Sequence, residues 1–274
     1  MGDTITKDQM LALQGRGRAE RAAFVAGLSD AERGASGEPN AWSAKDHLAH
    51  LLFWQRVRIR RLGAAARGEA VPDAEALADL DALKDPEALN PEIFERERDR
   101  QLSDILADFT TADAELAQLV QAFALTGLLD PGRNPERDGT PLWSGMLGSF
   151  MLHPQAHYAQ YYVERNDVDR ATEVYQAAAR AGAEICGASP TYGMLLYNLA
   201  CFYAVSGRRE QALYTLREAL PMAPDLTDWA KEDPDLTSLH DEPAFDALIN
   251  PEPETDEGAD RSPDRGEAPE AARQ

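Results

Sequence analysis

Apolar residues in the first part of the chain recur at the spacing of amphipathic helices. This pattern predicts a first helix over residues 7 to about 28 and a second over 44 to about 62, separated by a stretch at 29–40 that contains glycines and a proline. Ser43 is followed three residues later by Asp46, which is close to a capping box at the start of the second helix. Because this second helix is apolar on nearly every side, we expect it at the centre of its domain.

The next part of the chain predicts a crossover and two more helices. Residues 63–90 are acidic and alanine-rich with two prolines, which indicates a long crossover carrying at most a short helix. The Asn-Pro pair at 90–91 fits a cap and a first helical residue, and it predicts a third helix that runs to about residue 124. After a predicted loop at 126–138, the Thr-Pro pair at 140–141 predicts the start of a fourth helix.

Helical hairpins are predicted from about residue 153 onward, because a tetratricopeptide repeat pattern fits the sequence there. One full repeat fits when Gly207 is the turn glycine, and an upstream copy fits if an insertion at 183–191 is allowed. The segment 225–249 resembles the amphipathic ending that follows the last repeat in bacterial tetratricopeptide proteins, and we expect it to cap the stack. The matching positions are Leu196, Leu199, Ala200, Tyr203, Ala212, Leu216, Ala219 and Pro224 in the downstream repeat, and Ala159, Tyr162, Asn166, Ala171, Tyr175 and Ala178 upstream.

Composition and charge limit the classes of partner. The chain has 274 residues, which is enough for two modest cores, and its 43% hydrophobic and 27% charged residues are typical of folded proteins. The 48 acidic residues against 27 basic ones give a formal charge of -21, which repels phosphate backbones and anionic lipids. We therefore expect neither nucleic acid nor a membrane as a partner. No large apolar residue occurs in 250–274, which predicts a disordered acidic tail.

Several further signals are missing from the sequence. The first ten residues contain no basic region followed by an apolar one, and no stretch of about 18 apolar residues occurs, so we expect a cytoplasmic protein. Cys186 and Cys201 lie inside apolar helical patterns, which predicts reduced core thiols. The sequence has no phosphate-binding glycine loop, nucleophile elbow or Cys-x-x-Cys motif, so no nucleotide cofactor is expected.

Four of the five histidines fall in two close pairs, His47 with His50 and His153 with His157. The second pair has the four-residue spacing that places both imidazoles on one helical face. Neutral imidazole is a common ligand of divalent metals, and three ligands with an open position leave room for water or substrate. The alternative is that these histidines are partly buried and hydrogen-bonded without metal. Pro154 must begin a helix or kink one, which leaves the direction of His153 open.

Two segments resemble a known family. The run WSAKDHLAHLLFW at 42–54 resembles the second-helix signature of DinB-like proteins, especially of the ClbS (DfsB) branch. The segment HPQAHYAQ at 153–160 resembles the fourth-helix His-x-x-x-His-x-x-Gln pattern of metal-binding DinB-like proteins. The resemblance implies a four-helix bundle over 5–165. Together with the predicted hairpins over 152–249, which share the last bundle helix, it makes the expected fold class all-α.

Carried over residue by residue, the resemblance implies a divalent metal held by His50, His153 and His157. His47 is then a substitute ligand or a hydrogen-bonding neighbour. Three imidazoles accommodate zinc, nickel, iron or manganese. The implied activity is that of a metal-dependent hydrolase or thiol transferase that acts on a reactive or toxic small molecule.

Carboxylates and aromatic residues near these histidines are the remaining candidates for the site. Glu164 and Asp46 are the nearest acids in sequence, and they are the candidate proton acceptors. The aromatic residues form either an apolar substrate pocket or ordinary core packing. They are Trp42, Phe53, Trp54, Trp143 and Phe150.

The alternative function is protein interaction. In it the tetratricopeptide-like hairpins bind a protein partner, and the bundle is a metal-free structural cap. About three repeats are usually needed for a free-standing stack, whereas this sequence has one clear repeat, one stretched repeat and a capping segment. The short stack indicates docking against the bundle, and both hypotheses stay open at this point.

Overall fold

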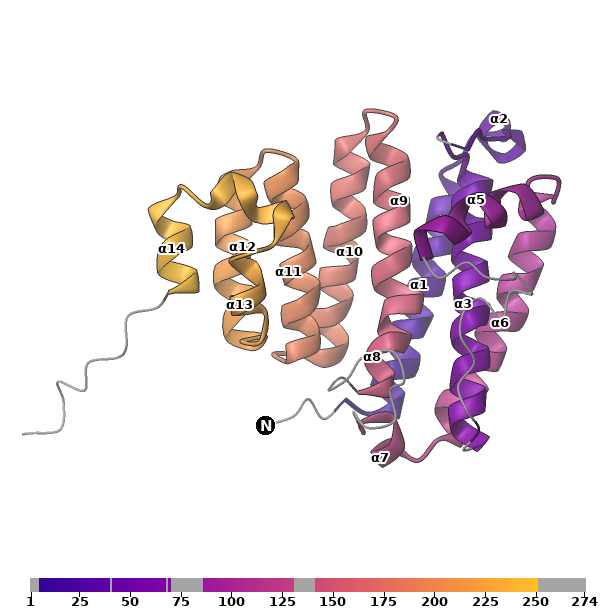
Figure 1. The fold of residues 1–274 in the computed structure, drawn as a ribbon, viewed down its shortest axis with the longest axis horizontal. Helices are drawn as coiled ribbons and strands as arrows, with labels where there is room; N and C mark the ends of the chain where they lie inside the picture. The colour runs from indigo at the N-terminus through magenta and orange to yellow at the C-terminus, as the bar shows by residue number, and fades with distance from the viewer. Residues whose placement is uncertain (1–4, 40, 68, 70–85, 131–140, 251–274) are drawn as a thin grey trace, which may run out of the picture.

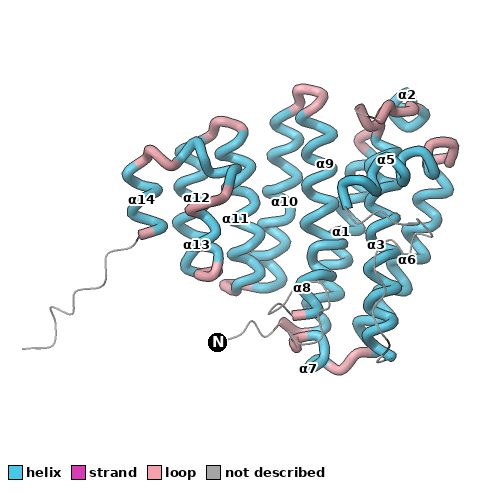
Figure 2. Tube along the Cα trace, viewed as in Figure 1, coloured by secondary structure: helices cyan, strands magenta, loops and turns pink. Residues whose placement is uncertain are grey.

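The protein is all-α in the part of the chain that the computed structural model describes, residues 5–39, 41–67, 69, 86–130 and 141–250 (Figure 1). Figure 2 shows helices joined by loops, with no strand in these residues, which confirms the expected fold class. None of the described helices combines the length and the apolarity that a bilayer-spanning segment needs. The elements are α1 (Lys7–Ala26), α2 (Asp30–Gly34), α3 (Ala44–Arg67), α5 (Pro86–Glu97), α6 (Leu102–Ala122), α7 (Leu125–Leu128), α8 (Leu142–Leu147), the π-helical turn η2 (Gly148–Leu152), α9 (His153–Val163), α10 (Val168–Cys186), α11 (Pro190–Val205), α12 (Arg209–Met222), α13 (Leu226–Ala230), the 3-10 helix η3 (Pro234–Leu239) and α14 (Pro243–Ile249).

An N-terminal bundle is built from α1, α3, α6 and the continuous run of α8, η2 and α9. α3 packs against α6 and α9, and α1 packs against α6, η2 and α10. The core between these helices contains Leu13, Leu48, Leu116 and Met151, all of them buried. α3, the second helix predicted from the sequence, therefore contacts most of the other bundle helices, as expected for a helix that is apolar on nearly every side.

The predicted capping box at the start of α3 is present. The Ser43 N–H donates to Asp46 Oδ2 at 2.9 Å, and the Ser43 hydroxyl donates to the same oxygen at 2.6 Å. In return the Asp46 N–H donates to Ser43 Oγ at 3.3 Å. Because this motif starts α3 at a defined residue, it sets the rotation of the helix that carries His47 and His50.

Two helical hairpins continue from the bundle: α9, the last bundle helix, pairs with α10, and α11 pairs with α12. Asn166 and Gly207 occupy the two turns, 41 residues apart, and both have a positive φ, of 60° and 77°. Glycine and asparagine tolerate this left-handed conformation best, which explains their use at the turns. The second helix of each hairpin buries alanines at matching positions, namely Ala171 and Ala178 in α10, and Ala212 and Ala219 in α12.

The segment after α12 packs against the second hairpin, which consists of α11 and α12. η3 packs against α11, and α14 packs against α12. Leu236, Leu239 and Phe245 are buried in the same apolar cluster as α11 and α12. The Tyr197 hydroxyl of α11 donates to the Asp233 carboxylate at 2.8 Å, which holds the start of η3 against that helix.

The predicted third helix over 90–124 is wrong, because two helices occupy this stretch. α5 ends at Glu97 and α6 begins at Leu102, while Asn90 and Pro91 lie inside α5 rather than at a cap. Lys45, from the first turn of α3, donates to the carbonyls of Glu97 at 3.4 Å and Arg98 at 2.6 Å. A cation on these last carbonyls stabilises the end of α5, and no local pattern in the sequence indicates it.

Smaller differences concern the segments between helices. α3 continues to Arg67, about one turn beyond its predicted end, and the short helices α2 and α7 lie in stretches expected to be loops. Most of the predicted crossover, most of the predicted 126–138 loop and nearly all of the acidic tail lie outside the described residues.

Gly17 provides a test of how α1 packs in the bundle. It lies against the backbone of η2, and an added Cβ would overlap the carbonyl oxygen of Phe150. We predict that Gly17→Ala lowers the free energy of unfolding by about 1–3 kcal/mol, because the two backbones must move apart. Urea unfolding followed by circular dichroism measures this change.

Gly15→Ala on the same helix is the matched control. A Cβ at Gly15 meets nothing within 4 Å, so the higher helix propensity of alanine should raise stability by up to about 1 kcal/mol. Equal effects of the two substitutions would contradict the packing of Gly17 against η2.

Candidate functional site

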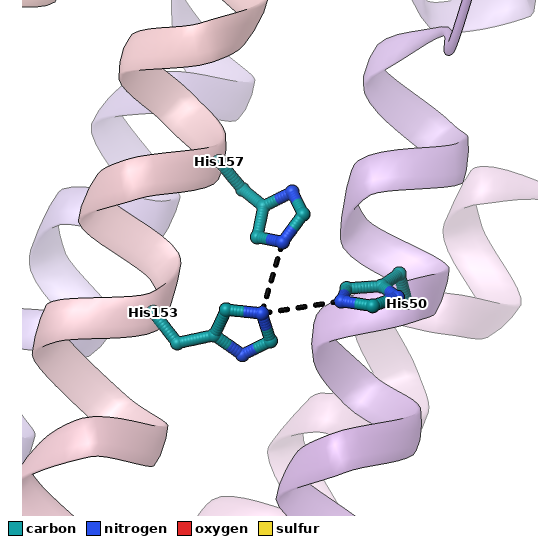
Figure 3. A group of neighbouring side chains, drawn as sticks. All are labelled: His50, His153 and His157. Carbon is teal, nitrogen blue, oxygen red and sulfur yellow. Dashed lines mark hydrogen bonds between the residues drawn. The ribbon is translucent and has the colours of Figure 1, made fainter. Parts of the chain in front are cut away.

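α3 and α9 bring three imidazoles together inside the bundle (Figure 3). His50 comes from α3, and His153 and His157 come from successive turns of α9. His153 Nε2 lies 3.1 Å from His50 Nε2 and 2.9 Å from His157 Nε2. One nitrogen of each ring lies within 4.8 Å of the other two, which is an arrangement able to hold a metal ion.

The turn that precedes His153 explains the direction of this side chain, which the sequence left open. Residues Gly148–Leu152 form a π-helical turn, and the His153 N–H donates to the carbonyl of Gly148, five residues earlier. Pro154 has no N–H to donate, and its ring disfavours an ordinary α-helical turn before it. The wider turn accommodates the proline without ending the helix, so His153 and His157 both point toward α3.

His47 is a fourth imidazole at the site, on α3. Its Nδ1 lies 3.0 Å from Nδ1 of His157, so one of these two nitrogens donates a hydrogen and the other accepts it. When His157 is the donor, its Nε2 keeps the lone pair that faces His153. Nε2 of His47 and Nδ1 of His50 are shielded from solvent and have no hydrogen-bond partner among the described residues.

All four imidazoles are held in the neutral form. Burial lowers the pKa of His47 to about 4 and the pKa of His153 to about 4. Burial, with smaller contributions from His153 and His47, lowers the pKa of His50 to about 3. The pKa of His157 is also lowered, chiefly by burial and then by the three neighbouring histidines. Neutral imidazole is the form that binds metals.

Trp42 and Trp54 are the predicted aromatic residues that contact the histidines. The Trp42 ring lies 5.2 Å from the ring of His50 and stacks on His157 with an interplanar angle of 8°. The Trp54 ring lies 6.3 Å from His50. The other three predicted aromatic residues pack elsewhere: Phe53 packs against the apolar cluster between α3 and α5, and Trp143 and Phe150 lie in the main core.

Tyr161 also lies beside the site, one turn after His157, although it was not among the predicted site residues. Its ring is 6.0 Å from His47, and its hydroxyl donates to Glu32 at 2.9 Å. Arg165 stacks its guanidinium 3.6 Å from the centre of the Tyr161 ring and donates to the Trp42 carbonyl at 3.4 Å. The four-residue spacing that relates His153, His157 and Tyr161 is the signal that would have found it.

The two candidate proton acceptors are engaged away from the imidazoles. Oδ2 of Asp46 accepts hydrogen bonds from the N–H and the hydroxyl of Ser43, and its other oxygen lies 3.4 Å from Lys45 Nζ. Glu164 is exposed at the end of α9 and accepts a hydrogen bond from Gln160 at 2.8 Å. The charge of Asp46 opposes the lowering of the His47 pKa, but neither carboxylate has a described hydrogen bond to a histidine, so their catalytic roles stay predictions.

A second group of possible ligands lies outside the bundle, at Cys201, Asp233 and Asp235. The Asp233 carboxylate already accepts hydrogen bonds from Tyr197 at 2.8 Å and from the Asp235 N–H at 3.0 Å. Burial raises the pKa of the Cys201 thiol, which therefore stays protonated. This group serves to hold η3 against α11. Cys201 is buried as predicted, while Cys186 is half-buried, and neither forms a disulfide.

Comparison with known proteins places the site within a family. The sequence matches the family model of the DinB superfamily over residues 15–161, a range that includes all four imidazoles. Searches of curated proteins and of solved structures found no match to the chain. The match extends into α9 and stops before α10, so it covers the bundle and not the later hairpins.

The lowered pKa values predict how stability depends on pH. Histidine in an unfolded chain has a pKa of about 6.5, so below that pH the unfolded state binds more protons than the native state. Stability is therefore lost as pH falls from about 6.5 toward the native pKa values. For protein stripped of metal with a chelator, we predict a loss of at most about 1.4 kcal/mol per pH unit for each buried imidazole.

His50→Gln tests this dependence, because His50 is only 4% exposed. Urea unfolding of the metal-free proteins at about pH 7 and pH 5.5 measures the free energy of unfolding at each pH. This variant should lose less of it between the two pH values than the native sequence does. His240→Gln, which removes an exposed imidazole outside the bundle, is the matched control for the loss of a histidine side chain. An unchanged slope in His50→Gln would show that His50 is not held neutral.

Proposed function

The chain belongs to the DinB superfamily, and from this premise we propose that it is an enzyme that binds a divalent metal through His50, His153 and His157. The proposed reaction class is hydrolysis or thiol transfer on a reactive small molecule, as in the ClbS-like or thiol-transferase members that the sequence resembles. The observation that carries this proposal is the meeting of three Nε2 atoms from neutral imidazoles on two facing helices.

The nitrogen contacts support a metal better than they support a set of hydrogen bonds. His153 Nε2 is within hydrogen-bond distance of two other Nε2 atoms, yet this nitrogen has either one hydrogen or one lone pair. The three atoms therefore cannot all form good hydrogen bonds with one another. A cation that accepts all three lone pairs satisfies them together, and zinc, nickel, iron and manganese all accept imidazole ligands.

A bound divalent metal would supply Lewis acidity and lower the pKa of a water or thiol at its open position. The chain's own residues would hold and shield that position. His47 would accept a hydrogen bond from His157 Nδ1 and so orient this ligand. Trp42 and Trp54 lie against His50 and His157 and would exclude bulk water from the site.

The second candidate function is a tetratricopeptide-type interaction scaffold with a metal-free bundle. The paired hairpins and their left-handed turns at Asn166 and Gly207 favour the repeat assignment. However, α9 belongs to the bundle core as well, and η3 covers α11. This leaves a short stack docked on the bundle, so we place this function second. A cytoplasmic location is part of both proposals.

Metal content is the first test of the proposed enzyme. We predict close to one zinc, nickel, iron or manganese ion per chain in tag-free purified protein, measured by inductively coupled plasma mass spectrometry. His157→Ala should lose this metal, because it removes one of three ligands. His240→Ala is the control and should retain it. Protein without metal, produced in medium that contains all four metals, would contradict the proposal and favour the scaffold.

His47 provides a second, finer test. We predict that His47→Ala weakens zinc binding by about 10- to 100-fold, because His157 loses the partner that fixes its orientation and tautomer. A competition titration of Zn²⁺ against a chromogenic chelator measures this change. His47→Gln can still offer an amide oxygen as acceptor and should recover part of the affinity. If His47→Ala binds zinc as tightly as the native protein, His47 has no role in positioning His157.

A further inference from the structure

A cavity of about 540 Å³ lies where the bundle meets the first hairpin, among α1, α9 and α10. Figure 1 shows these three helices side by side at the junction of the two halves of the molecule. Tyr158 and Tyr162 of α9 line the cavity, whereas His153 and His157 of the same helix point toward α3. The cavity is therefore separate from the histidine site, and its volume lies within the range of about 300–1,000 Å³ that is typical of small-ligand pockets.

The part of the cavity wall that α1 and α9 supply combines aromatic rings with an acid that has one carboxylate oxygen without a hydrogen bond in the described part of the chain. Glu20 of α1 has one carboxylate oxygen, Oε2, that is shielded from solvent and lacks a hydrogen-bond partner among the described residues. Phe24 and Tyr158 stack beside it in the cavity wall with ring centroids 4.5 Å apart. Burial raises the pKa of Glu20 to about 7, against the opposing effect of Arg16 and Arg180. Glu20 is half-buried and the hydrogen bonding of its carboxylate is incomplete, so a cationic donor in the cavity would add to the effect of Arg16 and Arg180.

The part of the cavity wall that α10 supplies carries guanidinium groups. Arg170 and Arg180 line the cavity together with Glu173. Arg170 lies 5.7 Å from the centre of the Tyr162 ring and pairs with Asp167 at 3.5 Å, outside the cavity lining. The charged lining thus contains two acids and two arginines. A zwitterion offers an oppositely charged partner to each sign of charge in this lining.

We propose that this cavity binds a small zwitterion of the free amino acid type, with its ammonium group at Glu20 and its carboxylate at the α10 arginines. An ammonium group in the cavity adds a charged donor beside the Glu20 carboxylate. The arginines present the planar donors that carboxylates prefer. The proposal involves no metal, so it can be tested independently of the proposed enzyme function.

Isothermal titration calorimetry on the full-length protein tests this proposal, with each of the twenty free L-amino acids as probe. We expect at least one to bind, and its analogue without the amino group to bind much more weakly. Glu20→Gln should weaken binding by about tenfold or more, because a neutral amide replaces the charged partner of the ammonium. Glu115→Gln, on α6, makes the same chemical change at an exposed site and should leave the affinity unchanged.

Ala177→Phe is a second variant, which fills the cavity from α10 and leaves its charges in place. It should abolish binding, and thermal unfolding of each variant verifies that it is folded. The proposal is overturned if none of the twenty amino acids binds, or if the analogue without the amino group binds equally well. It is also overturned if folded Glu20→Gln or Ala177→Phe protein keeps the native affinity.

Discussion

Four imidazoles packed between α3 and α9, two of them buried and two half-buried, impose the main constraint on the bundle. A buried polar ring without partners is costly, and here the partners are other imidazoles, at 2.9–3.1 Å between nitrogens. Such contacts form only if the two helices keep a fixed rotation and a fixed axial position. The capping box at Ser43 fixes α3, and the π turn before Pro154 fixes α9. Packing of Gly17 against Phe150 then holds α1 against that turn.

The histidine pairs were the most predictable part of the site. Four-residue spacing puts His153 and His157 on one face in any α-helix, and the capping motif at Ser43 is local in sequence. Their meeting with His50 followed from the family resemblance rather than from any local pattern. The π turn was not predictable, because a proline after His153 is equally compatible with a helix start, a kink or a wider turn. Only packing of the surrounding helices selects among these.

The error at 90–124 has the same physical origin. An Asn-Pro pair is a good helix start when judged locally, but α5 begins before it, at Pro86. The end of α5 depends on Lys45, which is more than 50 residues away in sequence and donates to the carbonyl of Arg98. The Glu20 cavity is also non-local, since its lining comes from three helices. Long-range contacts of this kind leave no periodic signal in the chain.

α9 links the two halves of the molecule physically. The π turn interrupts regular helical hydrogen bonding just before it, and a helix of 11 residues is marginal by itself. Its order must come from packing, with α3 on the histidine face and α1 and α10 on the tyrosine face. α10, the second helix of the first hairpin, therefore contributes to the histidine site without supplying a residue to it, because it supports the helix that carries His153 and His157. The hairpins are therefore a structural part of the histidine site rather than an independent module.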